Sequence, residues 1–492
     1  MRLSSISPIA VGVRLPAYEP AGHGTGIVHI GIGAFHRAHQ AVTTDDALAA
    51  QGGDWRIVGV SLRGTAAADA LNPQDGRYTV VERGAKGSTA RIIGSVSHVI
   101  AASREPGAAV ATMADPATRI VSLTVTEKAY GIDRATGGID RSHPAIAADL
   151  ATPRRPTGVL GHIVEALRLR QEAGVPPFTV LCCDNLPENG TLVRSGAIAF
   201  AEALDPTLAD HIANHVAFPC TMVDRITPAP TERTRADAAA LTGCEDHAAV
   251  ETEPFTQWVI EDRFPHGRPA WEAGGALFVE SAAPYERMKL RMVNGPHSMI
   301  AYAGLMAGHP LVRDVLADGG FAALVRRQMM AAAATLKPLK GIDFSDYADS
   351  LIARFANPAI AHETYQIAMD GTEKLPQRIF GPVLDAMANG QDIRPFAFAV
   401  ASWMRYSLGR KDDGTAYALR DPREAEIAAA LSGASNAVEI SGALHALPGL
   451  FPEALTNNVT WRRAVADCLT PMLDYGVAAA AEAEARLMLE PA

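Results

Sequence analysis

Cysteine is scarce in this 492-residue chain, and its spacing excludes two common classes of protein. The five cysteines include no pair separated by two residues. An odd number without such a pair is untypical of a disulfide framework and of a structural zinc site. We therefore expect reduced thiols and a cytoplasmic protein.

Basic charge and long apolar runs are also scarce. The 44 Lys and Arg residues against 54 Asp and Glu residues give a net charge of −10. General nucleic-acid and anionic-membrane binders need a basic face, so this balance argues against both. No run of uncharged apolar residues is long enough to span a bilayer, and the start, MRLSSISPIAVGVRLP, lacks the apolar core of a signal peptide. We therefore expect neither a membrane-spanning helix nor a signal peptide.

What the first part of the chain has is an alternation of short apolar runs with helix-like segments. Its length favours more than one domain. Strands are expected within the segments 26–33, 55–62, 78–83, 118–126 and 178–185. Helices are expected within 36–50, 106–114 and 157–174. This alternation predicts an α/β fold, a Rossmann-like, mostly parallel sheet covered by helices, over residues 1–284.

Two segments of this first domain do not fit the alternation. Segment 90–100 follows the turn-rich RGAKGST and is expected to be an inserted hairpin partner. Segment 225–275 is rich in proline and charge, so we expect loops around one or two short elements. From residue 285 the chain is rich in Ala, Leu, Met, Arg and Glu at helical spacing, which predicts a mainly α-helical domain over 285–492.

The stretch IVHIGIGAFHRAHQA, residues 27–41, begins like a nucleotide-binding turn. Gly31 would permit the tight turn, and Gly33 would let the backbone approach a pyrophosphate. His36 stands where a third glycine is expected, so the motif alone leaves an ordinary strand–turn–helix equally open. The candidate cofactor-binding residues of the turn are Gly31, Ile32, Gly33, Ala34, Phe35, His36 and Arg37.

The residues near the second strand leave the choice between NAD and NADP open. Asp54 precedes this strand, whereas an acidic residue at its end would hold the ribose of NAD. Arg63 follows the strand and could hold the 2′-phosphate of NADP, or be a surface arginine. His36 and His39 could ligate a metal, but no partner set accompanies them, and no metal site is predicted.

The stretch YERMKLRMVNGPHSMIAY, residues 285–302, places Lys289, Asn294 and His297 among apolar residues. Because Pro296 is disfavoured inside a helix, we expect a helix to begin with Asn294 as its N-cap. A buried lysine can act as an acid/base, an asparagine amide can stabilise an oxyanion, and a histidine can orient a hydroxyl. A snorkelling lysine, a plain cap and a core histidine remain the structural alternatives.

Other polar residues offer further candidates. Tyr285 and Lys289 match the YxxxK pair of short-chain dehydrogenases, a short pattern that here lies at a domain junction rather than inside one domain. Glu127, Asp184, Asn185 and Asn189 follow predicted strands, where ligands bind in α/β sheets. The residues 184–189 also fit an ordinary turn.

In combination, these motifs resemble the polyol-specific long-chain dehydrogenases, the mannitol dehydrogenase and fructuronate reductase family. Matching segments occur in family order from about residue 26 to 410: GIGAFHRAHQ, PQDGRYTVVERG, TVTEKAYG, CCDNLPENG, FPCTMVDRITP, QWVIEDRFPHGRPAWE, KLRMVNGPHS and DGTEKLPQR. The resemblance implies a Rossmann-like domain followed by a helical domain. It implies metal-independent, NAD(P)H-dependent interconversion of a secondary alcohol and a ketose. His36 is normal at its position in this family, and the Tyr285 interpretation loses most of its weight.

The resemblance also implies roles for individual residues. Lys289 would be the general acid/base, and His297 would hold the substrate oxygen. Asn185 and Asn294 would form the oxyanion site, and Glu127 would lie near a proton path. Asp224 and Lys374 would lie at the substrate pocket.

The substrate is narrowed by finer features of the resemblance. The segment GVSLRGTAAADALNPQDGRYTVVERG is closer to the fructuronate reductase (D-mannonate oxidoreductase) branch, and Gln366 stands where we expect arginine in some mannitol-active relatives. A hexuronate needs a cation for its carboxylate. Candidates are Lys374, Arg378, Arg225 and Arg37, each of which also fits a structural ion pair.

These features favour fructuronate over mannitol, with arabinitol-type polyols still open. The expected partner is a small sugar acid or polyol, and the expected assembly a monomer or small homo-oligomer. A dinucleotide-binding sensor without catalysis is the remaining alternative. The Lys289, Asn294 and His297 set argues against it, because a sensor needs no acid/base.

Overall fold

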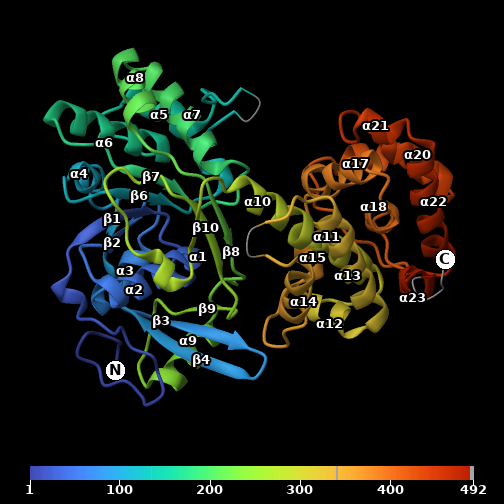
Figure 1. Ribbon diagram of the computed structural model, residues 1–492, viewed down its shortest axis with the longest axis horizontal. Helices are drawn as coiled ribbons and strands as arrows, with labels where there is room; N and C mark the ends of the chain where they lie inside the picture. The colour runs from blue at the N-terminus through green and yellow to red at the C-terminus, as the bar shows by residue number, and fades with distance from the viewer. Residues whose placement is uncertain (134–135, 340–341, 488–492) are drawn as a thin grey trace. The chain divides into compact units, whose positions relative to one another are not determined.

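The structure, a computed structural model, describes residues 1–133, 136–339 and 342–487, with the backbone but not the side chain of Glu127. The chain divides into two compact units, Met1–Ala283 and Pro284–Ala492. Figure 1 colours the first from blue to yellow-green and the second from yellow to red. No helix in the described ranges has the length and apolar character needed to cross a membrane.

The first unit contains a parallel sheet of five strands, β1 (Thr25–Ile30), β2 (Arg56–Ser61), β5 (Val96–Ala101), β6 (Ile120–Leu123) and β7 (Thr179–Cys182). Their order in the sheet is β5-β2-β1-β6-β7, and every neighbouring pair is parallel. The order reverses direction between β1 and β6, and this reversal is the switch point at which α/β sheets bind ligands. The predicted Rossmann-like sheet is confirmed.

Helices cover both faces of this sheet, because successive strand residues point to opposite sides. Val28 packs in one apolar cluster and its neighbour Ile27 in the other. The helices that contribute to the first cluster are α4 (Ala108–Ala114), α5 (Pro144–Ala151), α6 (Val159–Ala173), α7 (Asn189–Glu202) and α8 (Pro206–His215). Those of the second are α1 (Ala34–Ala38), α2 (Gln40–Gln51) and α3 (Ala66–Leu71).

An insertion between β2 and β5 forms a separate hairpin. Strands β3 (Tyr78–Gly84) and β4 (Gly87–Ile93) pair antiparallel, and β9 (Val250–Thr252) pairs parallel with β3. The expectation of one hairpin partner over 90–100 holds only for its first part. The chain breaks at Gly94, whose N–H donates to Asp45, and then continues as β5 of the central sheet.

The expectation of loops around one or two short elements in segment 225–275 is wrong. The segment contains the eleven-residue helix α9 (Glu232–Thr242), β9 and β10 (Gln257–Glu261). Strand β10 pairs with β8 (Thr221–Asp224) and β11 (Leu277–Val279). The prolines lie between these elements rather than within them, so their density indicated boundaries and not a loop.

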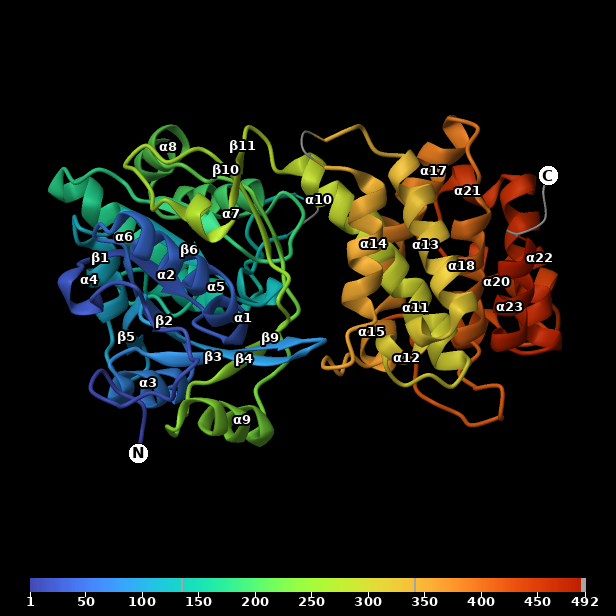
Figure 2. The same cartoon turned by 60° about the horizontal axis from the view of Figure 1, so that its bottom comes forward.

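The second unit is built of helices, as predicted. Its described helices are α10 (Ala283–Lys289), which begins at the unit boundary, α11 (Gly295–Met306), α12 (Val312–Ala317), α13 (Gly319–Ala334), α14 (Phe344–Phe355), α15 (Thr364–Ala368), α16 (Gly371–Leu375), α17 (Gly381–Ala388), α18 (Arg394–Tyr406), α19 (Glu424–Ala430), α20 (Ala437–His445), α21 (Glu453–Thr456), α22 (Val459–Asp474) and α23 (Val477–Leu487). Figure 2 shows α14, α11, α13 and α18 side by side, and their pairwise packing buries Phe321 and Phe396.

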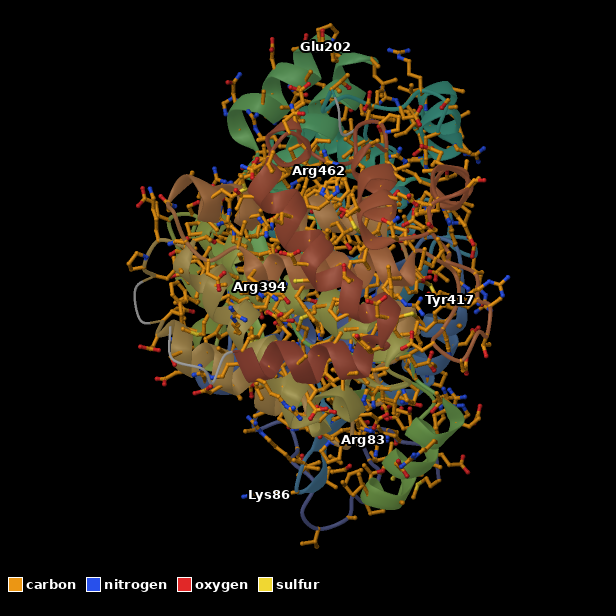
Figure 3. All side chains as sticks on the ribbon, turned by 90° about the vertical axis from the view of Figure 1, so that its right-hand side faces the viewer. Arg83, Lys86, Glu202, Arg394, Tyr417 and Arg462 are labelled. Atoms are coloured by element: carbon orange, nitrogen blue, oxygen red, sulfur yellow. The ribbon has the colours of Figure 1, made fainter. Side chains whose placement is uncertain are left out.

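A buried carboxylate ties α23 to two other helices. Glu484 accepts two bonds of 2.7 Å from Arg394 of α18 and one of 3.2 Å from Arg327 of α13. Figure 3 labels Arg394 on the face of the second unit that is turned to the viewer. A two-pronged arginine–carboxylate pair is directional as well as strong, so it fixes the last helix against the bundle.

Two π-helical segments interrupt the helices of this unit. The first π segment (Leu290–Asn294) joins α10 to α11, and the second π segment (Pro376–Phe380) joins α16 to α17. In each, the N–H of the following glycine bonds the carbonyl five residues earlier, Gly295 to Leu290 and Gly381 to Pro376. A proline follows each glycine, and the wider turn accommodates a residue without an N–H.

The expected helix start at Asn294 is therefore wrong. Asn294 has helical backbone angles, φ −72° and ψ −33°, and its side chain makes no cap bond to the following N–H groups. The helix runs on from α10 through the first π segment into α11. Pro296 marks a widened turn here and not a helix start.

Candidate active site

The glycine turn lies at the switch point of the parallel sheet. Gly31 follows β1 with φ of 95°, and a Cβ there would lie 2.0 Å from the carbonyl oxygen of Thr124, which follows β6. Only glycine fits this position. A Cβ on Gly33 would meet nothing closer than 3.8 Å, so the chain's own packing does not demand the second glycine. The space it leaves suits the close approach of a pyrophosphate.

The stacked rings of His29 and His36 pack beside this turn. His29 lies 2.8 Å from both Ser122 and Thr124 hydroxyls, and Thr124 donates to the Gly31 carbonyl. The ring of His36 stacks on His29 at 3.4 Å and 15°. Burial lowers the pKa of His29 to about 3 and that of His36 well below its ordinary value, so both rings are neutral. His36 thus packs α1 against β1 where a third glycine is usual.

The basic residues of this region differ in role. Arg37 donates from Nε to the Gly33 carbonyl at 3.2 Å and from Nη1 to the Ala248 carbonyl, so it braces the turn. Arg63 is exposed directly after β2, at the same edge of the sheet. His39 lies 3.1 Å from the Gln257 carbonyl. Among the described residues, no three His, Cys, Asp or Glu side chains gather to hold a metal.

The turn after β7 presents Asn185. Asp184 accepts from the Tyr130 hydroxyl at 2.5 Å and from the Val125 N–H at 3.1 Å. The Asn189 amide donates to the Asp184 carbonyl at 3.0 Å. These bonds fix the loop, whereas Asn185 itself is exposed at the carboxyl edge. The backbone of Glu127 begins a short turn after β6, and its side chain lies outside the described residues.

Asp224 and Arg225 lie at the end of β8. Asp224 is the last residue of the strand and is buried. Arg225 donates to the Glu82 carboxylate at 2.6 Å and to the Glu253 carbonyl at 2.9 and 3.1 Å. Like Arg37, it is held by bonds within the first unit, in keeping with the structural role that the sequence left open for both arginines.

In the second unit, the first π segment aligns three of the predicted catalytic residues. Lys289 ends α10, Asn294 ends the π segment and His297 lies one turn into α11. In a regular α-helix, residues five apart point about 140° away from each other. The wider π turn brings Lys289 and Asn294, which are five residues apart, onto one side of the helix. His297 lies three residues after Asn294 and therefore on the same side. All three are about 9% exposed.

His297 is held by aromatic contacts. Its ring packs on Phe355 at 4.1 Å and meets the ring of His362 edge-on at 5.4 Å and 81°. Burial, followed by the charges of His362, Arg354, Arg378 and Lys289, lowers its pKa well below the ordinary value. The imidazole is therefore neutral. Its Nε2 contacts no hydrogen-bond partner in the described part of the chain.

Arginines clamp the first π segment from two sides. Arg291 donates to Thr335 of the chain after α13 and, at 2.6 Å, to Asp385 of α17. Arg378 of the second π segment donates to the Asn294 carbonyl at 3.4 Å and to the Ser298 hydroxyl at 3.3 Å. The two π segments also touch directly, since a Cβ on Gly295 would lie 3.0 Å from the Arg378 carbonyl oxygen. These contacts fix the backbone that carries Asn294.

Lys374 is bound to the main chain of its own neighbourhood. Its Nζ donates to the carbonyls of Ile367 and Met369 at 3.2 and 2.5 Å and lies 3.9 Å from Asp370. Burial and then the charge of Arg378 lower the pKa of Lys374 to about 8. Gln366 is exposed on α15.

The structure thus places the predicted residues in two groups. In the first unit, the glycine turn and Asn185 share the carboxyl edge of the sheet, with Arg63 at the same edge. In the second unit, Lys289, Asn294, His297 and Arg378 form one cluster. Sequence reasoning missed Phe355, His362 and Arg354 beside His297. The recurrence of Lys-Leu followed by Gly-Pro, at 289–296 and 374–382, was the available signal for the paired π segments.

Comparison with known proteins gives matches over nearly the whole chain. The mannitol dehydrogenase Rossmann domain family matches residues 25–273, and the mannitol dehydrogenase C-terminal domain family matches residues 281–465. The chain is 43% identical to the uncharacterized oxidoreductase YeiQ of Escherichia coli K12, over 94% of this chain and 95% of that protein. It is 42% identical to the D-mannonate oxidoreductase of the same organism, over 94% and 96%.

Solved structures give the same match. The mannitol 2-dehydrogenase of Pseudomonas fluorescens, in a ternary complex with NAD and D-mannitol, superposes with a TM-score of 0.84. It is 38% identical, and the match covers 100% of both chains. The names of the D-mannonate oxidoreductase and the mannitol 2-dehydrogenase give different substrates.

Proposed function

The chain belongs to the mannitol dehydrogenase family, and we propose that it is an NAD-dependent oxidoreductase that interconverts D-fructuronate and D-mannonate. The observation that carries this proposal is the cluster of Lys289, Asn294 and His297, aligned by the first π segment and surrounded by cations. An anionic sugar acid suits such surroundings better than a neutral polyol. The similarity to D-mannonate oxidoreductase supports the same choice.

The residues of the glycine turn fit a dinucleotide. Gly31 makes the tight turn at the switch point, and Gly33 leaves open space for a pyrophosphate. Bound NADH would supply the hydride that reduces the keto carbon. Arg63 remains the residue that would admit the 2′-phosphate of NADP.

The second unit supplies the proton and the polarising groups. Lys289 would give its proton to the alkoxide oxygen that forms as the ketone is reduced. The amide of Asn294, with that of Asn185, would donate to this oxygen. His297 is neutral, so its Nε2 can bond a substrate hydroxyl without adding a charge to the site.

Further residues complete the proposal. Glu127 would lie near the path by which the proton of Lys289 is replaced, and Asp224, Lys374 and Arg378 at the substrate pocket. The proposed reaction is metal-independent, with Lys289 supplying the proton and the asparagine amides polarising the carbonyl. An unchanged rate after dialysis against EDTA would support this point.

The test is NADH oxidation at neutral pH with D-fructuronate and D-fructose in parallel, each repeated with NADPH. Faster turnover of fructuronate, with NADH preferred, is the expected result. Turnover of fructose alone would favour the second candidate function, mannitol 2-dehydrogenase, for which the similarity to the Pseudomonas fluorescens enzyme speaks. Absence of turnover with both would contradict the proposal.

A further inference from the structure

Asn185 lies on a surface turn, although its proposed role needs a fixed position. The turn follows β7, and the exposed Asn185 stands between the partly buried Asp184 and the buried Leu186. An amide stabilises a developing alkoxide only if it is already held where the charged oxygen will form. A donor that performs this task from a turn therefore has to be supported by the residues around it.

The Asp184 carboxylate supplies the first support. It accepts from the Tyr130 hydroxyl at 2.5 Å and from the Val125 N–H at 3.1 Å, and both donors belong to the chain after β6. Burial raises the pKa of Tyr130 well above its ordinary value, so the phenol keeps its proton and remains a donor. The carboxylate thus joins the turn of Asn185 to the neighbouring turn at the same edge of the sheet.

Asn189 supplies the second support from the start of α7. Its amide nitrogen donates to the Asp184 carbonyl at 3.0 Å and to the Thr221 carbonyl at 3.0 Å, and its oxygen accepts from the Thr221 N–H at 2.9 Å. Asn189 is only 1% exposed, so water does not compete for these bonds. Asp184 is therefore held through its carboxylate and also through its carbonyl, which belongs to the peptide group that leads into Asn185.

The turn between these supports contains a strained residue. Glu188 has φ 46° and ψ 46°, in the left-handed region that residues with a side chain rarely adopt. Two residues later Gly190 lies against the chain before β8, since a Cβ there would lie 2.6 Å from the carbonyl oxygens of Phe218 and Pro219. Strain of this kind persists only where the surrounding contacts fix the backbone, and it is typical of functional sites.

We infer that Tyr130, Asp184 and Asn189 are positioning residues that hold the Asn185 amide in its reactive place, and that the strained Glu188 stiffens the same turn. This inference rests on the proposed function, in which Asn185 donates to the alkoxide oxygen, and it adds the residues that set the position of this donor. They act through Asn185 and not on the substrate itself. A glycine at position 188 would take the same conformation without strain, but it would also allow others.

A double-mutant cycle tests whether Tyr130 acts through Asn185. The assay uses NADH and the ketose that the wild type reduces faster. Tyr130→Phe is expected to lower kcat about 5- to 30-fold and to change KM and the NADH affinity less than about 3-fold, because a donor to the transition state is displaced. In an Asn185→Ala background, the same substitution is expected to change kcat less than about 2-fold. Asp184→Asn keeps an oxygen acceptor and should retain more activity than Asp184→Ala.

Equal losses of kcat in the two backgrounds overturn the inference and leave the proposed function intact. An Asn185→Ala enzyme of full activity contradicts the role that the proposed function gives to Asn185, and the inference with it.

Glu188→Gly separates positioning from general stability, with Asp75→Gly as the matched control. Asp75 has φ 55° and ψ 33° in the turn before β3, so glycine relieves the same conformation there. Glu188→Gly is expected to raise the Tm by about 1–3 °C. It is nevertheless expected to lower kcat about 3- to 10-fold, because the loosened turn lets Asn185 move. Asp75→Gly should leave kcat unchanged.

Hydrogen exchange tests the same turn without any turnover. The amides of segment 184–190 are expected to exchange faster in Glu188→Gly and in Tyr130→Phe than in the wild type, because the turn opens more often. Unchanged exchange in both variants overturns the inference, whichever substrate the enzyme takes.

Discussion

The two π segments of the second unit follow the same local pattern and differ in what their side chains do. A Lys-Leu pair stands at the start of each segment: its leucine is the first residue of the first segment and directly precedes the second. A Gly-Pro pair follows each segment. In the first, the widened turn aligns Lys289 and Asn294 on one side of a helix. In the second, Lys374 and Arg378 are tied to main-chain carbonyls. The first segment therefore aligns the residues of the proposed chemistry, and the second supports the backbone of the first.

This difference shows that a pattern of residues does not by itself assign a role. Both lysines lie shortly before a π segment, Lys289 one residue and Lys374 two residues before its start. Lys374 donates to two carbonyls at the end of α15 at hydrogen-bond distance, and these bonds fix its ammonium group. A lysine fixed by carbonyls is a structural cation, whereas an acid/base needs access to a reacting oxygen.

The largest expected effect comes from removing the lysine of the first segment. Lys289→Ala is expected to lower kcat about 10²- to 10⁴-fold, because the proposed general acid/base is lost. Stopped-flow and steady-state assays with fructuronate measure the loss, while NADH fluorescence checks that cofactor still binds. Arg287→Ala, an exposed residue on the same helix, is the control. A Lys289→Ala enzyme with more than about a tenth of wild-type activity would contradict the assignment.

The glycines that end the two segments give a matched pair of intermediate effect. A Cβ on Gly295 would lie 3.0 Å from the Arg378 carbonyl oxygen, whereas a Cβ on Gly381 would meet nothing within 4 Å. Gly295→Ala is expected to destabilise the fold by about 1–3 kcal/mol through overpacking. Gly381→Ala is expected to stabilise it by about 0.5–1 kcal/mol, because alanine favours helix over glycine. Chemical denaturation measures both, and effects of equal sign would show that the two segments are packed alike.

The smallest effect concerns the pH dependence of stability and the lysine of the second segment. The pKa of Lys374 is lowered from 10.5 to about 8 in the folded chain. Between pH 8 and 10.5, Lys374 therefore holds more protons in the unfolded chain than in the folded chain. Its titration makes the free energy of unfolding rise with pH across that window. Lys374→Met is expected to flatten the rise by about 1–2 kcal/mol, after allowance for partial exposure of the lysine.

Denaturation of both proteins at pH 7.5, 9 and 10 measures this difference. Other groups that titrate in the same window contribute equally to the two proteins and cancel in the comparison. Parallel curves of unfolding free energy against pH for wild type and Lys374→Met would show that the pKa of Lys374 is not lowered in the folded chain.

The parallel sheet and the position of the glycine turn could be predicted from the sequence because their signals are local. Ile27, Val28 and Ile30 form an apolar run that ends at Gly31, and the φ of 95° at this glycine is a requirement of its own backbone. The helical second unit has an equally local signal in its periodic apolar residues. The family resemblance, carried by several long motifs, is confirmed by the family matches.

The features that could not be predicted depend on tertiary contacts or on a single extra residue. The contact between His297 and His362 joins residues 65 positions apart, and no local pattern announces it. Proline led to two wrong predictions. Pro296 predicted a helix start but lies within a continuous helix, and the prolines of 225–275 predicted loops but separate ordered elements. The roles of Lys289, Asn294, His297 and the other site residues stay predictions.

The first π segment has a consequence for how this site could change over generations. A π turn is equivalent to an α-helix into which one residue has been inserted. Deleting Val293 would restore regular helical winding and place Asn294 four residues and His297 seven residues after Lys289, a spacing that a regular α-helix keeps on one side. The three side chains would still face one direction, but the proline after Gly295 would clash with the carbonyl four residues before it. The extra residue thus opens the backbone for Pro296, and its loss would damage the helix at the proline and not the direction of the lysine and the histidine.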